Sequence, residues 1–417
     1  MASLFQKIKH VYLKELKKKV AFFFSIGFDA FGFMISNLFF AKTKESAIRS
    51  IVYVMDKAQP HIFRLADRIS KIEGYQVKVL TSEKAIYFAD KSALDYSVLY
   101  FRNIWHLKLL LKRIPSIYIV HFFHPLSVFA SKIVKYAKYK TIVDWKDVSL
   151  NYYGFNPPFK YLRKDIPHEK YAMTHADGII ARSYEPHIAI RRYQIEKKPS
   201  NLFFLEYCDN SLFVPQKKKI VDPDDIHLVY IGGVKDMSAN LPESFLPIIN
   251  ELNRQKIHFH IYPGQNRNWH VFSDYKKKAE ELEYFHWHES IKPAEIASEI
   301  SQYHFGLIPF FTDELPELND KRSGAMNQKL FNYLEAALPI IIGTGPLFQI
   351  WLINRYRVGL KLSRAKFADL RSNIDLNTYQ QMQEQVLKSR EILSLDANMN
   401  RLLHFYETVS PTKTVDK

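Results

Sequence analysis

Lys329, Asn332 and Tyr333 form the group of polar residues with the clearest candidate chemistry. They follow Ser323 and Asn327, either of which could begin a helix, and they lie away from its apolar face, in the first turns. A lysine near a helix N-terminus could neutralise a diphosphate, and Asn332 could bond a ribose hydroxyl. The alternative is an ordinary solvated face. The apolar face, expected to pack on a sheet, comprises Leu330, Leu334, Ala337 and Leu338.

Two glycines, Gly232 and Gly233, directly follow an apolar run that reads as a strand. Without side chains they would let a phosphate approach backbone N–H groups. A glycine pair after a strand is also a common turn, so the pair alone is not specific. No Gly-x-Gly-x-x-Gly and no Walker A sequence occurs, which argues against NAD-type and P-loop sites.

Candidate acids and bases end two strands of the first half. Asp144 or Asp147 could act as the general base that takes a proton from an attacking hydroxyl, or either could be a loop or helix-cap acid. His121 and His124 could contact a donor or an acceptor. A metal site would need further ligands that the sequence does not indicate, so no metal is predicted.

Two further histidines, His286 and His288, alternate with Trp287 and should share one face of a strand. A structural role is expected for both.

The elements that must position these residues are strands and helices in alternation. A strand, a helix, a glycine and a second strand form the βαβ unit of a parallel sheet, and the pattern continues through both halves. In doubly wound sheets, ligands bind at the carboxyl ends of the strands, so two such domains should enclose a cleft. The expected strands are 51–55, 76–80, 116–120, 141–145, 178–181, 201–205, 226–231, 257–262, 284–287, 304–309 and 339–343, with helical patterns over 61–72 and 379–408.

Length and composition favour a globular chain of two main domains. The chain has 417 residues, of which 47% are hydrophobic and 24% charged. A single cysteine, Cys208, excludes an internal disulfide and a Cys-rich zinc site and suits a reducing compartment. The formal net charge of +16 favours an anionic partner.

The N-terminal residues combine six lysines, all between Lys7 and Lys19, with the apolar stretch Val20 to Ala41. Asp29 and two glycines argue against a transmembrane span, and no signal-peptide cleavage site is evident. Two interpretations stay open. The segment is either a basic amphipathic helix plus an apolar helix in the membrane interface, or a helical cap on the first domain.

From Ile51 to Leu362 the chain resembles, in order, the GT-B glycosyltransferases, especially family 4 and its relatives. Each motif is moderately specific, and their order makes the resemblance stronger. The matching segments are 51–55 with 74–80, the "a-D-x-i-i-x-x-S" strand at 175–183, the "F-x-P" linker at 207–215, the "l-x-y-v-G" strand at 229–233 and the "K-x-x-E-Y-x-x-x-G-x-P" helix at 329–339.

The resemblance implies an α/β fold with two Rossmann-like domains that face a cleft, and the basic and apolar residues before Ile51 are expected to form an N-terminal helical extension. The extension would be 1–49, the acceptor domain 50–214, the nucleotide-sugar donor domain 215–365 and the C-terminal helices 366–417. It also implies a metal-independent, hexosyltransferase-like enzyme without a cofactor. The enzyme would transfer a sugar from a nucleotide-diphosphate sugar to a glycan or lipid-linked acceptor, in cell-surface polysaccharide or glycoconjugate synthesis.

Residue by residue, the resemblance assigns donor phosphate contact to Gly232 and Gly233 and diphosphate binding to Lys329. Asn332 stands where the family has a ribose-binding glutamate, and Glu335 could compensate from the next turn. The partner position of that glutamate is Gly324, and Ala337 replaces a usual glycine. In the segment 142–147, Lys146 replaces a histidine that faces the sugar in many relatives.

Alternatives within the same fold are a nucleotide-sugar epimerase or hydrolase, or a non-catalytic partner protein, because fold alone does not fix function. Nucleic-acid binding is not expected, since no recognised module accompanies the positive charge. The expected location is the cytoplasm, peripheral to an anionic membrane surface.

Overall fold

The computed structural model describes residues 48–56, 59–82, 94–123, 127–136, 138–157, 159–196, 199–215, 225–234, 244–264, 269–311 and 324–411. The N-terminal extension as far as residue 47, His124, Ser323 and linker residues 216–224 lie outside this part of the chain. Within it, no helix combines the length and the apolar character that crossing a membrane requires.

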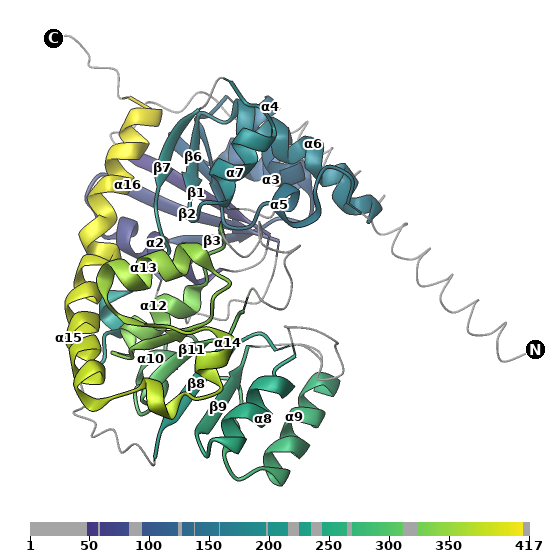
Figure 1. Cartoon of the computed structure of the whole chain (residues 1–417). Coiled ribbons are helices and arrows are strands. Elements are labelled where there is room, and N and C mark those ends of the chain that lie inside the picture. Colours follow the sequence, from purple (N-terminus) through teal and green to yellow (C-terminus); the bar gives the residue numbers. More distant parts are fainter. Residues whose placement is uncertain are drawn as a thin grey trace, which may run out of the picture.

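The first half of the chain forms a seven-stranded sheet in the order β3-β2-β1-β4-β5-β6-β7, in which all neighbouring strands are parallel (Figure 1). Its central strands are buried on both faces, as the apolar runs predict. The strands are β1 (Arg49–Met55), β2 (Tyr75–Thr81), β3 (Ser97–Tyr100), β4 (Ile117–Phe123), β5 (Thr141–Trp145), β6 (Gly178–Ala181) and β7 (Ser200–Phe203). The helices are α2 (Pro60–Ser70), α3 (Ile104–Arg113), α4 (Ser127–Tyr136), α5 (Ser149–Tyr153), α6 (Lys160–His175) and α7 (Glu185–Arg192).

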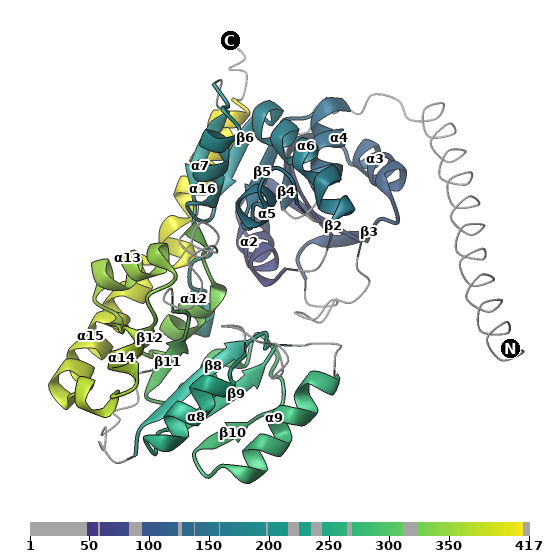
Figure 2. The ribbon, with the colours of Figure 1, turned by 45° about the vertical axis from the view of Figure 1, so that its right-hand side comes forward.

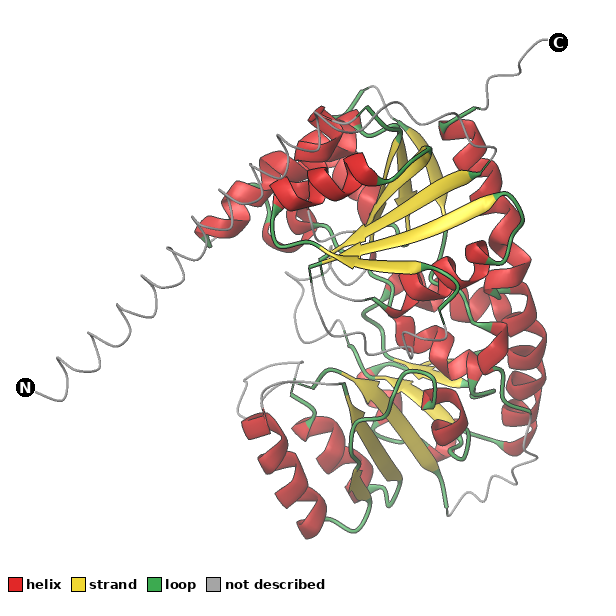
Figure 3. Cartoon of the chain, turned by 180° about the vertical axis from the view of Figure 1, so that it is seen from behind, coloured by secondary structure: helices red, strands yellow, loops and turns green. Residues whose placement is uncertain are grey.

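The second half forms a six-stranded parallel sheet in the order β10-β9-β8-β11-β12-β13. Figure 3 shows the two sheets as separate layers, each flanked by helices. The strands are β8 (His227–Gly232), β9 (His258–Pro263), β10 (Phe285–Trp287), β11 (Phe305–Ile308), β12 (Ile340–Ile342) and β13 (Gly359–Lys361). The helices are α8 (Leu246–Arg254), α9 (Trp269–Glu281), α10 (Ile296–Ile300), α12 (Gln328–Glu335), α13 (Leu347–Tyr356) and α14 (Arg364–Phe367).

Both sheets are doubly wound, so the prediction of two Rossmann-like domains is confirmed. The strand order reverses between β1 and β4 in the first sheet and between β8 and β11 in the second. Ligands bind beside such switch points, at the carboxyl ends of the strands. In the second domain this point is the end of β8, where Gly232 lies.

The C-terminal helical region differs from the single pattern expected over 379–408. It divides into α15 (Leu376–Ile392) and α16 (Leu395–Val409), because the Ser394 hydroxyl accepts a hydrogen bond from the Ala397 N–H and starts a new helix. Helix α15 packs on α12 and α13 of the second domain, whereas α16 packs on β7 of the first. Figure 2 shows both helices along one side of the molecule, spanning the two domains.

Two short edge strands, β3 and β13, were not predicted. Both have partly exposed residues and neither has a long apolar run. The prediction that Tyr333 faces away from the sheet is wrong. Tyr333 is fully buried, its hydroxyl donates to the Leu307 carbonyl at 3.1 Å, and its ring packs against Gly306, where a Cβ would lie only 2.3 Å from the ring.

Candidate active site

A cavity of about 280 Å³ opens at the carboxyl ends of β8 and β9, beside the start of α12. The first domain contributes one lining residue, Lys146, which follows β5. The other lining residues belong to the second domain. They are Ile231, Gly232, Tyr262, Pro263, Gly264, Ile291, Ile296, Asn327, Gln328, Lys329 and Asn332.

The side chain of Lys329 packs directly against Gly232. Gly232 has a φ of +116°, which a residue with a side chain rarely adopts. A Cβ at this position would lie 3.0 Å from Cε and 3.3 Å from Nζ of Lys329. The lysine stem therefore crosses the turn directly, and its ammonium lies 5.0 Å from the centroid of the Tyr230 ring. Gly233 does not line the cavity, and its carbonyl accepts a hydrogen bond from the Tyr230 hydroxyl at 2.8 Å.

Two lysines from opposite domains line this cavity. Burial and the repulsion of Lys146 lower the pKa of Lys329 to about 8, with Glu206 acting in the opposite direction. Burial lowers the pKa of Lys146 as well, but its ion pair with Glu206, at 2.7 Å, outweighs burial and raises it. Lys146 therefore stays cationic. In the sequence, Lys146 stands out only as a replacement for a histidine, and its position after a strand is the signal that it faces the cleft.

Glu206 is almost completely buried, and its carboxylate also lies 3.9 Å from Nδ1 of His61. His61, at the start of α2, is 2% exposed, and burial lowers its pKa well below the ordinary value. Neither ring nitrogen of His61 has a hydrogen-bond partner within the described ranges. The sequence contained no spacing that would have singled out this histidine.

Apolar and aromatic side chains also line the cavity. Ile291 and Ile296 line it together with Tyr262, whose ring stacks on His288 with centroids 4.2 Å apart and planes inclined by 4°. The Tyr262 hydroxyl donates to Glu299 at 2.7 Å, which fixes the ring. The cavity thus combines two cationic side chains with aromatic and apolar ones.

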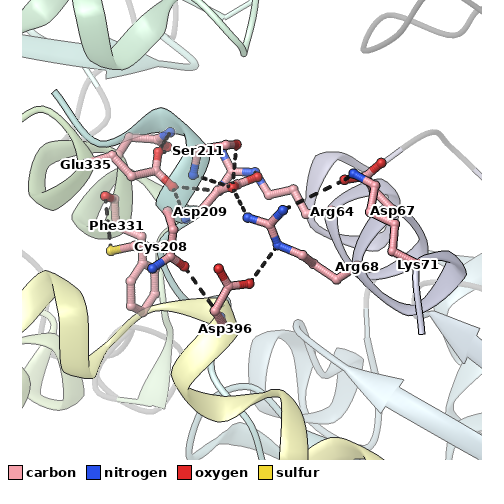
Figure 4. A network of polar contacts seen from close by, with 12 residues as sticks. Arg64, Asp67, Arg68, Lys71, Cys208, Asp209, Ser211, Phe331, Glu335 and Asp396 are labelled. Carbon is pink, nitrogen blue, oxygen red and sulfur yellow. Dashed lines mark hydrogen bonds and ion pairs between the residues drawn. The ribbon is translucent and has the colours of Figure 1, made fainter. Parts of the chain in front are cut away.

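Glu335 does not line the cavity, so the prediction that it contacts the donor does not fit its position. Its side chain is fully buried and accepts hydrogen bonds from Arg64 of α2 at 2.7 Å and from the Asp209 N–H at 2.8 Å (Figure 4). Burial raises the pKa of Glu335, although Arg64 opposes the shift. Asn332 does line the cavity, and its amide donates to Glu335 at 3.1 Å. Glu335 therefore joins the two domains and holds Asn332.

The pair Asp144 and His121 also lies away from the cavity. Asp144 is 0% exposed and accepts hydrogen bonds from Nε of Arg182 at 2.7 and 2.9 Å. His121 is equally buried, with Nε2 3.1 Å from Asp144 and Nδ1 2.8 Å from the Tyr406 hydroxyl of α16. Burial alone would raise the pKa of Asp144, but Arg182 and His121 lower it. An acceptor cannot reach this carboxylate, so the prediction that it is a base does not fit its position.

Comparisons with known proteins bear on the family and on the fold of the chain. Residues 248–404, which include Lys329 and Asn332, match the family model described as glucosyltransferase 3-like, C-terminal domain. Sucrose-phosphate synthase from Thermosynechococcus elongatus has a similar structure, with a TM-score of 0.65 at 10% identity over 87% of this chain and 99% of the other. For a glycosyltransferase from Rickettsia africae the TM-score is 0.62 at 10% identity, over 88% and 100%. The chain is a GT-B glycosyltransferase.

A further structural neighbour of this GT-B glycosyltransferase is Anabaena HepE, which has been solved in complex with UDP-glucose. The TM-score is 0.59 at 9% identity, over 86% of this chain and 99% of HepE. No curated protein matches the chain. At such identities the structural likenesses bear on the fold, whose predicted GT-B arrangement they confirm.

In this GT-B glycosyltransferase the predicted donor residues Gly232, Lys329 and Asn332 come together around one cavity. Of the catalytic candidates, Asp147 is exposed and next to the cavity-lining Lys146, and its carboxylate accepts a hydrogen bond from Tyr152 at 2.6 Å. His124 lies outside the described residues.

Proposed function

We propose that the cavity binds the diphosphate of a nucleotide sugar between the two domains, with UDP-glucose as the first donor to test. The observation that carries this proposal is the pair of lysines, Lys146 and Lys329, which come from the two domains and line one cavity beside the Gly232 turn. A donor diphosphate has the negative charge to bridge them. The glucosyltransferase 3-like match and the UDP-glucose complex of HepE support this choice of donor.

The lining residues suggest how the donor lies. The diphosphate would lie beside the two lysines, where α12 begins at Gln328 and the side chain of its N-cap residue, Asn327, makes no capping hydrogen bond. A helix N-terminus favours an anion there. The nucleobase would lie against Tyr262, Ile291 and Ile296. Asn332 would bond the ribose hydroxyls.

Transfer would then proceed to a glycan or lipid-linked acceptor without a metal or another cofactor. Lys146, Lys329 and the N–H groups at the start of α12 would stabilise the charge of the departing nucleoside diphosphate. Asp147 is the accessible acid nearest to Lys146 in the chain, and we assign to it the acceptance of the acceptor's proton. The products would belong to a cell-surface polysaccharide or glycoconjugate.

Calorimetric titration with UDP and UDP-glucose tests this proposal. A charge-assisted contact contributes about 1.5–3 kcal/mol, so Lys329→Met and Lys146→Met should each weaken UDP binding at least tenfold. Lys361→Met is the matched control, since Lys361 is an exposed lysine of the same domain as Lys329. Equal affinity in all three variants would remove both lysines from the site. Binding of UDP-glucose without turnover on any acceptor would favour a non-catalytic partner protein.

We also propose that the enzyme works on the cytoplasmic face of an anionic membrane. The sequence of residues 7–41 supplies lysines and apolar area, the two signals that stable interfacial binding needs. The surface of α3 and α4 adds Trp105 and Tyr136, 50% and 61% exposed, on either side of Lys108. Neither helix contains an acidic residue.

Sedimentation with vesicles tests the membrane proposal. The full chain should pellet with vesicles that contain anionic lipid and not with neutral ones, and high salt should reduce the binding. Removal of residues 1–41 should weaken binding and leave UDP affinity unchanged. A full chain that stays in the supernatant at low salt, or a shortened chain that fails to fold, would support the alternative of a helical cap.

A further inference from the structure

Five histidines gather on one face of the second sheet, at the edge formed by β8, β9 and β10. Strand periodicity places His258 and His260 of β9 on the same face, beside His286 of β10. The register pairs His227 of β8 with His258, and His260 with His286. The rings of each pair stack with centroids 4.4 Å apart. The fifth member, His288, follows β10 and lies against His260, with centroids 5.2 Å apart.

We propose that Asp225, His227 and His258, at the outer end of this cluster, bind a divalent transition metal ion, with Zn²⁺ as the best match. Their ligand atoms all lie within 4.8 Å of one another. Oδ1 of Asp225 is 2.9 Å from Nε2 of His227 and 3.6 Å from Nε2 of His258. Ligands about 2.0–2.1 Å from a tetrahedral zinc ion are separated by roughly 3.4 Å, a value between these two distances. Two imidazoles and one carboxylate are a donor set that zinc accepts, and a water molecule would complete the tetrahedron.

The inner histidines provide the hydrogen-bond acceptors that such a site requires. A metal-binding imidazole donates its other ring N–H to an acceptor, which fixes its orientation. Nδ1 of His227 lies 2.9 Å from Nε2 of His260, and Nδ1 of His258 lies 2.8 Å from Nε2 of His286. His260 continues the chain, with its Nδ1 3.0 Å from Nε2 of His288.

These contacts fix the tautomers when the ion is bound. If each outer Nδ1–H donates to an inner imidazole, the Nε2 lone pairs of His227 and His258 both face the Asp225 oxygen. Lone pairs that face a carboxylate oxygen repel it unless a cation lies between them. Asp225 is the most exposed of the three, with 62% side-chain exposure, so its carboxylate can move to accommodate the ion.

The site is separate from the donor cavity. His227 is the first residue of β8 and Gly232 the last, so about five residues of strand, or roughly 16 Å, separate them. The ion would therefore take no part in sugar transfer. It would instead link Asp225, where the chain enters the second sheet, to His258 of β9.

Zinc titration of the tag-free, full-length chain after treatment with EDTA tests this inference. The expected result is one Zn²⁺ per chain by elemental analysis and calorimetry, and a higher melting temperature with Zn²⁺ than with EDTA. Asp225→Asn combined with His258→Gln should weaken Zn²⁺ binding at least 100-fold and abolish the rise in melting temperature. His404→Gln, which changes an exposed histidine of α16, is the matched control and should bind Zn²⁺ like the unaltered chain.

The affinity for UDP reports on the fold of each variant, because the donor cavity lies at the other end of the sheet. If the double variant retains UDP affinity and binds Zn²⁺ as the control does, the proposed ligands are wrong. If the unaltered chain binds no Zn²⁺, the cluster is a hydrogen-bonded histidine network in which His227 donates to Asp225, and the proposal fails. Asp225→Asn alone, an exposed change, gives the same test if the double variant does not fold.

Discussion

Replacing Asp144 by asparagine separates a structural role of this carboxylate from a catalytic one. Asp144 is 0% exposed and ion-paired with Arg182, whose guanidinium is also buried. The substitution leaves a buried guanidinium opposite a neutral amide. The amide oxygen can still accept one hydrogen bond from Arg182, but the amide nitrogen would face donors that the second carboxylate oxygen now satisfies.

The expected loss of stability follows from that geometry. Removing one partner of a buried ion pair lowers the free energy of unfolding by about 3–5 kcal/mol. Because one hydrogen bond from Arg182 remains, we expect Asp144→Asn to lower it by about 3 kcal/mol. For a domain of about 150–250 residues, each kcal/mol lowers the melting temperature by about 2–4 °C. The melting temperature should therefore fall by about 6–12 °C. At temperatures where the variant is folded, turnover should stay within a few fold of normal.

Thermal unfolding and turnover, measured on the same samples, distinguish the two roles. Asp147→Asn is the matched control, because Asp147 is exposed and close in sequence. It should leave the melting temperature within about 2 °C and, as the proposed base, should reduce turnover more than 100-fold. The opposite pattern, a lost rate with an unchanged melting temperature for Asp144→Asn, would refute the buried-pair argument and return Asp144 to catalysis.

Three other predictions follow from the second domain. The pKa of Lys329 is about 8 without a donor, and a bound diphosphate would raise it, so donor affinity is greatest well below pH 8 and falls above it. UDP should therefore bind roughly tenfold more weakly at pH 9 than at pH 7. A Lys329→Met variant with the same pH dependence would contradict this explanation. Ala337 has a φ of +59° at a helix end where glycine is usual, so Ala337→Gly should stabilise the chain by about 0.5–1 kcal/mol in urea denaturation, and a loss of stability would show that the backbone there is not strained. Glu335→Gln leaves Arg64 without its buried partner and should lower the melting temperature with little change in UDP affinity, whereas weaker UDP binding at an unchanged melting temperature would place Glu335 in the donor site.

Much of the fold could be predicted because its strands are buried on both faces. Such strands are continuous apolar runs, and the helices and glycines between them indicate a parallel sheet. The donor side of the site was predictable for a related reason. Gly232 and Lys329 stand at the ends of elements, and the carboxyl edge of a doubly wound sheet brings such ends together.

The remaining site residues could not be placed because their environment depends on distant partners. Periodicity assumes that a helix has one solvated face, but α12 packs against β11, α10 and α15, so every residue from Leu330 to Glu335 is buried. The charge of Asp144 is compensated by Arg182, 38 residues later in the chain, and that of Glu335 by Arg64, 271 residues earlier. No local spacing in the sequence marks either pair.

The path of α16 has a consequence for the order in which the chain can fold during synthesis. The hydroxyl of Tyr406 lies 3.0 Å from that of Tyr53 and 2.8 Å from His121, both in central strands of the first sheet. That sheet thus lacks part of its covering until residues 395–409 have left the ribosome. The second domain has its own sheet, and the core cluster that belongs to it alone ends at Met382 of α15, so this part can fold earlier. The amino-terminal domain, although synthesised first, is therefore expected to be completed last, and a stop codon before Leu395 should expose its core rather than release an independent unit.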